Sequence, residues 1–142
     1  GQQGGNVVWR VTFDPPPEDW HAVGFRDIDW KKTSGPTGSE FGTKERPGLK
    51  WEGTDVWLRQ EFSIAKLPPG QFSLEIAVDD SAEVYIDGIL AASIPEYTQR
   101  QFKVVTLSDE IVAALKPGKH ILAIHAHNIG GLAYVEARLI LK

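Results

Sequence analysis

The chain of 142 residues contains neither cysteine nor methionine. Without cysteine it has no disulfide, no thiolate nucleophile and no cysteine-ligated zinc site. No apolar run approaches the roughly 18 residues that a membrane-spanning helix needs, and no signal-peptide pattern precedes Asn6. The net charge of −4 comes without a basic stripe, which argues against nucleic acid and anionic membranes as partners.

The length and the 42% share of hydrophobic residues fit one globular domain with a core that needs no covalent staples. We expect this domain to cover residues 6–142. Residues 1–5 are rich in glycine and read as the end of a linker or a remnant of cloning. The absence of an initiating methionine favours a module from a longer, processed protein.

Alternation of apolar and polar residues predicts a series of strands that each bury one face. An Asp87-Gly88 pair marks a hairpin turn, and Ser108 caps a short helix with Asp109 and Glu110 in its first turn. The expected strands cover residues 7–13, 56–64, 72–78, 84–86, 89–92, 102–107, 121–127 and 133–141. About eight short strands and one brief helix predict an all-β fold, an antiparallel β-sandwich.

Five stretches carry a family resemblance. They are Trp20 with Phe25–Trp30, Gly38–Thr43, Asp55–Phe62, Glu83–Gly88 and Leu115–Asn128. Their order and spacing resemble the galactose-binding-domain-like β-sandwich, a jelly-roll found beside the catalytic domains of many polysaccharide-degrading enzymes. Arg26 stands where the family pattern has an acidic residue, and Asp87 where it has asparagine.

The resemblance implies a non-catalytic carbohydrate-binding module that targets an attached glycan-active enzyme to polysaccharide. Its expected partners are a polysaccharide or oligosaccharide and a covalently linked catalytic domain, in a secreted or periplasmic parent protein, with the module itself a monomer. The sequence has no nucleophile elbow, phosphate-binding loop or metalloprotease helix, so we expect no enzymatic activity. The alternative is a structural sandwich that buttresses a catalytic domain without binding sugar.

A carbohydrate site needs aromatic rings that pack on sugar C–H groups beside polar side chains that fix hydroxyls. The strand alternation puts several such groups on non-core faces, together with Tyr134, Glu136 and Arg138 if the last strand shares the sheet. The alternative is a solvated sheet face with weak cross-strand pairs, and loop tryptophans that pack on the protein. Arg59 either donates to sugar hydroxyls or forms a structural ion pair with Glu61 or Glu136. The candidate ligand-binding residues are Trp20, Trp51, Trp57, Arg59, Tyr97, His125, His127 and Asn128.

No cofactor is required by this interpretation, but Asp79 and Asp80 form a candidate calcium site. A similar run occurs in the protective-antigen-type lectin fold, where an Asp–Asp pair with an unusual peptide bond holds calcium and sugar. The alternative is a strand-ending turn in which the carboxylates cap backbone amides. His125 and His127 lack an evident third ligand for zinc, so a sugar hydroxyl or a cross-strand hydrogen bond is the expected partner.

Overall fold

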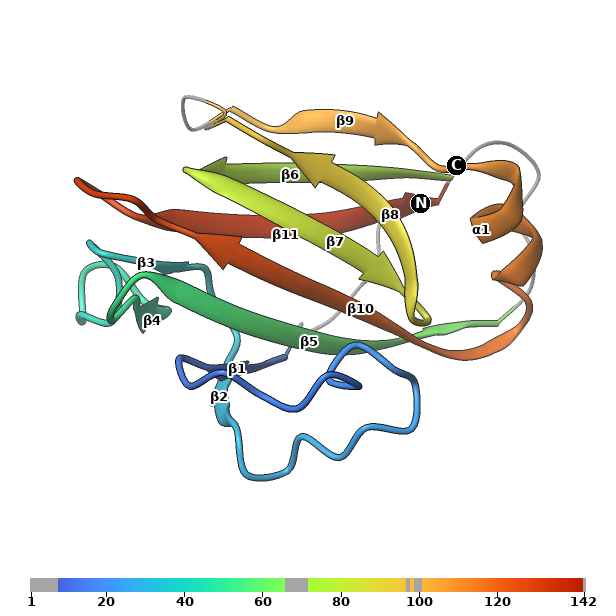
Figure 1. Cartoon of the computed structure of the whole chain (residues 1–142), viewed down its shortest axis with the longest axis horizontal. Coiled ribbons are helices and arrows are strands. Elements are labelled where there is room, and N and C mark those ends of the chain that lie inside the picture. The colour runs from blue at the N-terminus through green and yellow to red at the C-terminus, as the bar shows by residue number, and fades with distance from the viewer. Residues whose placement is uncertain (1–7, 66–71, 97, 99–100, 142) are drawn as a thin grey trace.

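The computed structural model describes residues 8–65, 72–96, 98 and 101–141, whose strands form two stacked sheets (Figure 1). Sheet I has the strand order β2 (Lys31–Thr33), β1 (Trp9–Thr12), β5 (Asp55–Ile64), β10 (Gly118–His127), β7 (Ser81–Ile86) and β8 (Ile89–Ile94). Sheet II has the order β4 (Leu49–Lys50), β3 (Thr37–Gly38), β11 (Tyr134–Leu141), β6 (Phe72–Asp79) and β9 (Lys103–Thr106). The predicted all-β sandwich is confirmed.

All eight expected strands are present, although their ends shift by up to three residues. The sequence reading misses β2, β3 and β4, which lie in the irregular stretch before β5. These strands are two or three residues long, too short to show an alternating pattern. The pair β3–β4 is also parallel, whereas the other strand pairs are antiparallel.

The main core lies between the two sheets, where each long strand points alternate side chains inward. Val56, Leu58 and Phe62 of β5 face Leu74 and Ile76 of β6 across this layer, all of them buried. Burying one such side chain stabilises the fold by roughly 1.5–3 kcal/mol, so this layer supplies most of the driving force. Trp9 also joins the core, as its position on the apolar face of its strand predicts.

The predicted helix and hairpin turn both appear. The helix α1 covers Asp109–Ala114, and the Ser108 hydroxyl accepts a hydrogen bond from the Ile111 amide at 3.4 Å. Asp87 and Gly88 have φ angles of 52° and 83°, the left-handed values that a tight turn between β7 and β8 requires. With only six residues in the described helix, no described helix could span a membrane.

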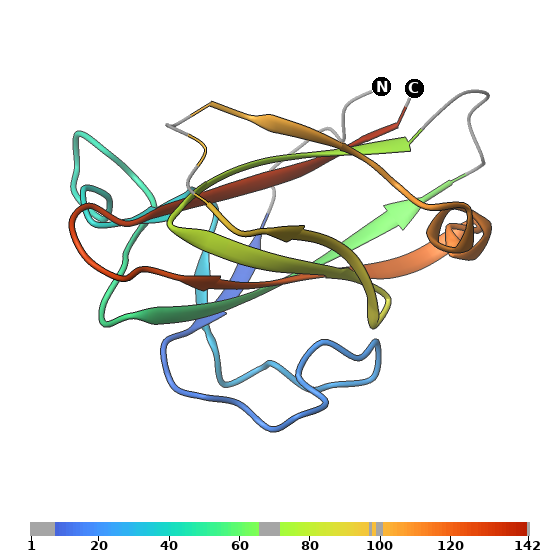
Figure 2. The same ribbon diagram turned by 45° about the horizontal axis from the view of Figure 1, so that its top comes forward.

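Residues 13–30, here called the covering segment, lie on the outer face of sheet I (Figures 1 and 2, blue). Trp20 from this segment packs with Trp57, Ile121 and Ala123 of the sheet in a second, smaller core. Phe25, Trp30 and Tyr85 border that cluster. Trp57 lies on the non-core face of β5, as predicted, but the part of this face around Trp57 is not a solvated surface because the covering segment buries it.

Candidate functional site

Arg59 fastens the covering segment to sheet I. Its Nε donates to Asp27 Oδ2 at 2.8 Å, and its two terminal nitrogens donate to the backbone carbonyls of Trp20, Ala22 and Phe25 at 2.6, 2.8 and 3.1 Å. Four of the five guanidinium N–H groups are thereby used, and the residue is only 2% exposed. This geometry favours the structural interpretation of Arg59.

The acidic partner of Arg59 differs from the predicted one. The predicted ion-pair partners are Glu61 and Glu136, whereas in the structure Arg59 pairs with Asp27 of the covering segment. Glu61 instead lies near Lys119 on the surface, at 3.4 Å. Glu136 belongs to sheet II and accepts a hydrogen bond from the Tyr134 hydroxyl. Alternation identifies the face of a strand, but not which distant segment covers that face.

The three candidate tryptophans are buried, each 5–8% exposed. Trp51 packs in the main core, and Trp57 stacks on the His125 ring with centroids 4.6 Å apart. The Trp20 ring lies nearly perpendicular to the rings of Tyr85 and His125, in T-shaped contacts. Their roles as ligand contacts stay predictions, but the burial favours the alternative in which these rings pack on the protein. Tyr97 lies outside the described residues.

His125 and His127 meet Asp55 on neighbouring strands, which confirms that β5 and β10 share a sheet. His125 Nε2 and His127 Nδ1 lie 2.8 and 2.9 Å from the same oxygen, Asp55 Oδ1. Of the two partners expected for these histidines, a sugar hydroxyl or a cross-strand hydrogen bond, the cross-strand hydrogen bond is present. The last strand does not join this surface, since β11 lies in sheet II, where Arg138 pairs with Glu75 at 3.0 Å.

A hollow of about 260 Å³ opens beside these two histidines, where β7 begins and β8 and β10 end. The side chains of His127 and Glu83 are 46% and 49% exposed, so both are accessible to a ligand. Sequence reasoning misses Glu83, Ser81 and Ser93, although the period of two on β7 places Ser81 and Glu83 on the same face. We call this site the histidine hollow; it is lined by Ser81, Ala82, Glu83, Ser93, Ile94, Pro95, His125 and His127.

Asp55 organises the histidine hollow electrostatically. Partial burial raises the pKa of Asp55, but hydrogen bonds from His127, His125 and Thr54 outweigh that effect and hold the pKa below its ordinary value of 3.8. A carboxylate only accepts hydrogen bonds, so each bonded ring nitrogen carries a hydrogen. In a neutral His127 the other nitrogen, Nε2, is then an acceptor that remains for a ligand hydroxyl.

The lowered pKa of Asp55 predicts an acid-sensitive contribution to stability. Because the folded pKa lies below the unfolded one, this contribution is present above pH 3.8 and is lost as the pH falls through the folded value. We expect Asp55→Asn to reduce the drop in melting temperature between about pH 5 and pH 2. Thermal unfolding of both proteins across that range measures this, and identical slopes would refute the assignment.

Asp79 is the last residue of β6, Asp80 follows it, and the peptide bond between them is cis. The Asp80 carboxylate accepts a hydrogen bond from the Ile129 amide at 2.6 Å, and this bond lowers the pKa of Asp80 against the opposing effect of burial. Asn128 is buried beside it and, with its amide oriented to suit its neighbours, donates to Asp80 Oδ2 at 3.0 Å. Asp80 therefore caps a backbone amide, which favours the turn interpretation, although that amide lies in the loop after β10 and not in the turn itself.

Calcium at Asp79 and Asp80 stays a prediction. Within the described ranges, no group of three or more His, Asp or Glu side chains is arranged to hold a metal ion. If calcium binds here, saturating calcium must raise the melting temperature through the linkage term RT ln(1 + [L]/Kd). Equal melting temperatures in chelator and in saturating calcium would show that Asp79 and Asp80 do not bind calcium.

No protein-family model matches the sequence, and no curated protein matches it. Among solved structures, the fold is similar to part of a glycosyl hydrolase family 2 member from Bacteroides cellulosilyticus DSM 14838, with a TM-score of 0.64 and 13% identity over 96% of this chain and 20% of that one. It is also similar to part of a β-glucuronidase from Ruminococcus gnavus in complex with D-glucuronic acid, with a TM-score of 0.61 and 20% identity over 90% of this chain and 22% of that one.

A β-glycosidase from Bacteroides vulgatus gives a TM-score of 0.58 and 15% identity over 92% of this chain and 19% of that one. The chain therefore spans about a fifth of the length of these glycosidases. At such identities the likeness is one of fold. It identifies a β-sandwich that also occurs as one part of longer glycosidase chains.

Proposed function

We propose that this chain is a non-catalytic accessory β-sandwich domain of a longer glycan-active enzyme, secreted or periplasmic, and that it binds carbohydrate in the histidine hollow. The likeness to one part of several glycosidases supports the accessory role. The family resemblance of the motif stretches supports carbohydrate as the ligand class. The covalently linked catalytic domain is then the partner that benefits from the binding.

The observation that carries the proposal is the chemistry of the hollow. Sugar hydroxyls both donate and accept hydrogen bonds, and the lining offers the Glu83 carboxylate, the Ser81 and Ser93 hydroxyls and a histidine ring nitrogen. Asp55 holds both histidine rings in place through Oδ1, so little side-chain entropy is lost when a ligand binds. Pro95 is the exposed apolar residue of the lining and supplies contact for sugar C–H groups, whereas Ala82 and Ile94 are buried in the main core beneath it.

The size of the hollow sets the expected affinity. At about 260 Å³ it is smaller than the roughly 300–1,000 Å³ of sites for drug-sized ligands, so it holds one or two sugar units. We expect micromolar to millimolar dissociation constants, which correspond to roughly 4–8 kcal/mol. Tethering to an enzyme converts such weak contacts into a high effective concentration on a polymer.

The carboxylates near the hollow support a binding role over glycoside cleavage. Cleavage normally uses one carboxylic acid that donates a proton and a second carboxylate, roughly 5–10 Å apart across the bond. The hydrogen bonds from both histidines hold the pKa of Asp55 low, which makes it an anion rather than a proton donor. Asp55 is therefore best suited to orienting the two rings.

A second candidate function is a structural domain that supports a neighbouring catalytic domain and binds no sugar. The burial of Trp20, Trp51 and Trp57 favours it, because the most common sugar-stacking surfaces are open aromatic rings. The extensive hydrogen bonding of Arg59 to the covering segment is also that of a scaffold. The two candidates differ in one measurable property, retention by polysaccharide.

Affinity electrophoresis in gels that contain a panel of polysaccharides tests the proposal. We expect the wild-type domain to be retarded by at least one of them, and Glu83→Gln and His127→Ala to migrate about as fast as in gels without polysaccharide. Glu110→Gln on α1 removes the same charge at the opposite end of β10 and should keep the wild-type retardation. Wild-type migration unchanged by every polysaccharide would favour the structural candidate.

A further inference from the structure

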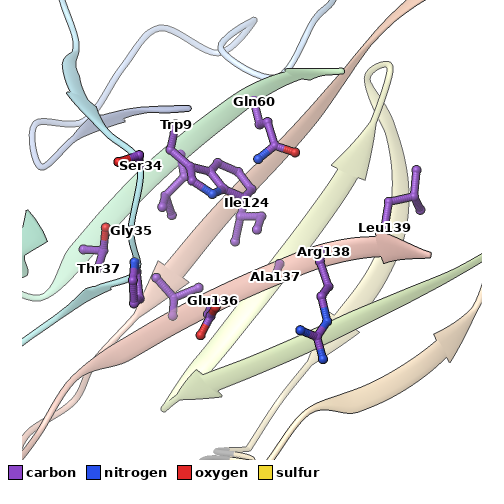
Figure 3. A pocket seen from close by; sticks show the side chains of 13 residues that line it. Trp9, Ser34, Gly35, Thr37, Gln60, Ile124, Glu136, Ala137, Arg138 and Leu139 are labelled. Atoms are coloured by element: carbon purple, nitrogen blue, oxygen red, sulfur yellow. The ribbon is translucent and has the colours of Figure 1, made fainter. Parts of the chain in front are cut away.

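A second cavity, separate from the histidine hollow, lies between the two sheets where β1 and β3 meet β11 (Figure 3). Its volume is about 190 Å³. Most of its lining is apolar and belongs to both layers, including Leu58 and Ile124 from sheet I and Val135 and Ala137 from sheet II. The indole of Trp9 forms one wall.

Two buried polar groups in this lining have no hydrogen-bond partner among the residues that the structure describes. They are the Gln60 amide nitrogen Nε2 and the Thr37 hydroxyl, on side chains 6% and 0% exposed. Gln60 occupies an inward position of β5 between Leu58 and Phe62, where the alternation favours an apolar residue. Figure 3 shows its amide directed from β5 toward Ile124. A buried donor without a partner is costly, so this amide is suited to a ligand that supplies the missing acceptor.

The volume of the cavity limits what can enter. An engineered apolar cavity of about 150 Å³ in another protein binds benzene, so a space of about 190 Å³ suits a single six-membered ring. It is smaller than the histidine hollow of about 260 Å³ that we propose for carbohydrate. Ser34 and Arg138 are exposed at its rim, which gives a path from solvent.

The charges around the cavity favour an uncharged ligand. Arg138 lines the rim, but its Nε donates to Glu75 at 3.0 Å and its guanidinium lies over the Phe102 ring. Glu136, also at the rim, accepts a hydrogen bond from Tyr134. Because these two charges already have partners and the inner lining is apolar, a charged ligand would lose hydration without compensation.

We propose that the inter-sheet cavity is a binding site for one small uncharged ring that carries a hydroxyl or carbonyl group. The apolar part of the ring packs against Trp9, Leu58 and Ile124. The oxygen of the polar group accepts a hydrogen bond from Gln60 Nε2. This site is independent of carbohydrate binding, because it shares no residue with the histidine hollow.

Phenol and benzene form a matched pair of probes that differ by one hydroxyl. Titration of the isotope-labelled domain, followed by the NMR shifts of the Trp9 indole N–H and the Gln60 side-chain amide, should show saturable phenol binding with a dissociation constant near or below about 1 mM. Gln60→Leu should weaken phenol binding about tenfold and leave benzene binding equal or tighter, because only phenol uses the lost donor. Ala137→Leu should abolish binding of both probes by filling the cavity.

His127→Ala serves as the control and should leave the phenol titration unchanged, since His127 lies in the other site. A wild-type domain whose Trp9 and Gln60 signals do not respond to saturating phenol would overturn the proposal, and the cavity would then hold water alone. A parallel loss of phenol and benzene binding in Gln60→Leu would overturn the role of the amide donor. If Ala137→Leu does not fold, the different effects of Gln60→Leu on phenol binding and on benzene binding still test the proposal.

Discussion

Arg59→Ala is expected to lower the free energy of unfolding by about 3–5 kcal/mol, the usual cost of removing one partner from a buried ion pair. The substitution removes the donor to Asp27 and to the carbonyls of Trp20 and Phe25, and it leaves the Ala22 carbonyl with the Phe25 amide alone. It also releases the covering segment that buries Trp57. Urea denaturation followed by tryptophan fluorescence measures this loss.

Two further variants separate the geometry of Arg59 from its charge. Arg59→Lys keeps the positive charge but loses the planar fork that reaches three carbonyls, so it should also lower the melting temperature. Arg46→Ala is the matched control, because Arg46 forms an exposed pair with Glu40 and should cost no more than about 1 kcal/mol. Equal losses for Arg59→Ala and Arg46→Ala would show that the covering segment does not depend on this residue.

Leu74→Ala is expected to cost about 2–5 kcal/mol of unfolding free energy, because it opens a void in the main core. Leu74 is fully buried and lies on β6 between Val105 of β9 and Leu139 of β11. Its removal therefore affects the packing of three strands at once. Chemical denaturation gives the value directly.

Leu90 provides the matched control for this substitution. It is 52% exposed on the edge strand β8, so Leu90→Ala should change the stability by less than about 0.5 kcal/mol. A loss at Leu74 as small as that at Leu90 would contradict the assignment of the inter-sheet layer as the main core.

The strands and their buried faces are readable from the sequence because each face is encoded locally. The alternation around Val56 and Leu58 predicts β5, and Asp87-Gly88 predicts the hairpin, since two residues with positive φ suffice for that turn. The Ser108 cap predicts the start of α1 for the same reason. Each of these signals lies within a few residues of the structure that it forms.

The covering segment is not readable in this way. Residues 13–30 have no period, and the contacts of Arg59 with Trp20 and Asp27 join residues 39 and 32 positions apart. The clustering of Trp20, Phe25 and Trp30 in an irregular stretch is the one local signal that this stretch packs on something. The alternation within a strand also does not show to which sheet the strand belongs. Tyr134, Glu136 and Arg138 therefore could not be assigned from the sequence to sheet II, the layer opposite His125.

The histidine hollow is only partly readable. Sequence reasoning identifies His125 and His127 from their alternation on β10. It misses Ser93 and Pro95, because they reach the hollow through the β7–β8 hairpin rather than through their own spacing. Gln60 escapes notice because a single polar residue on an apolar strand face is common, and only the cavity around its amide makes it informative.

The central claim is that carbohydrate binds beside His125 and His127, on the part of sheet I that the covering segment leaves open. NMR shift mapping with an oligosaccharide of the polysaccharide that retards the domain tests it most directly. We predict shifts concentrated at residues 81–83, 93–95 and 125–127, with little change at the buried Trp20, Trp51 and Trp57. Shifts concentrated at those tryptophans, or none at saturating oligosaccharide, would contradict it.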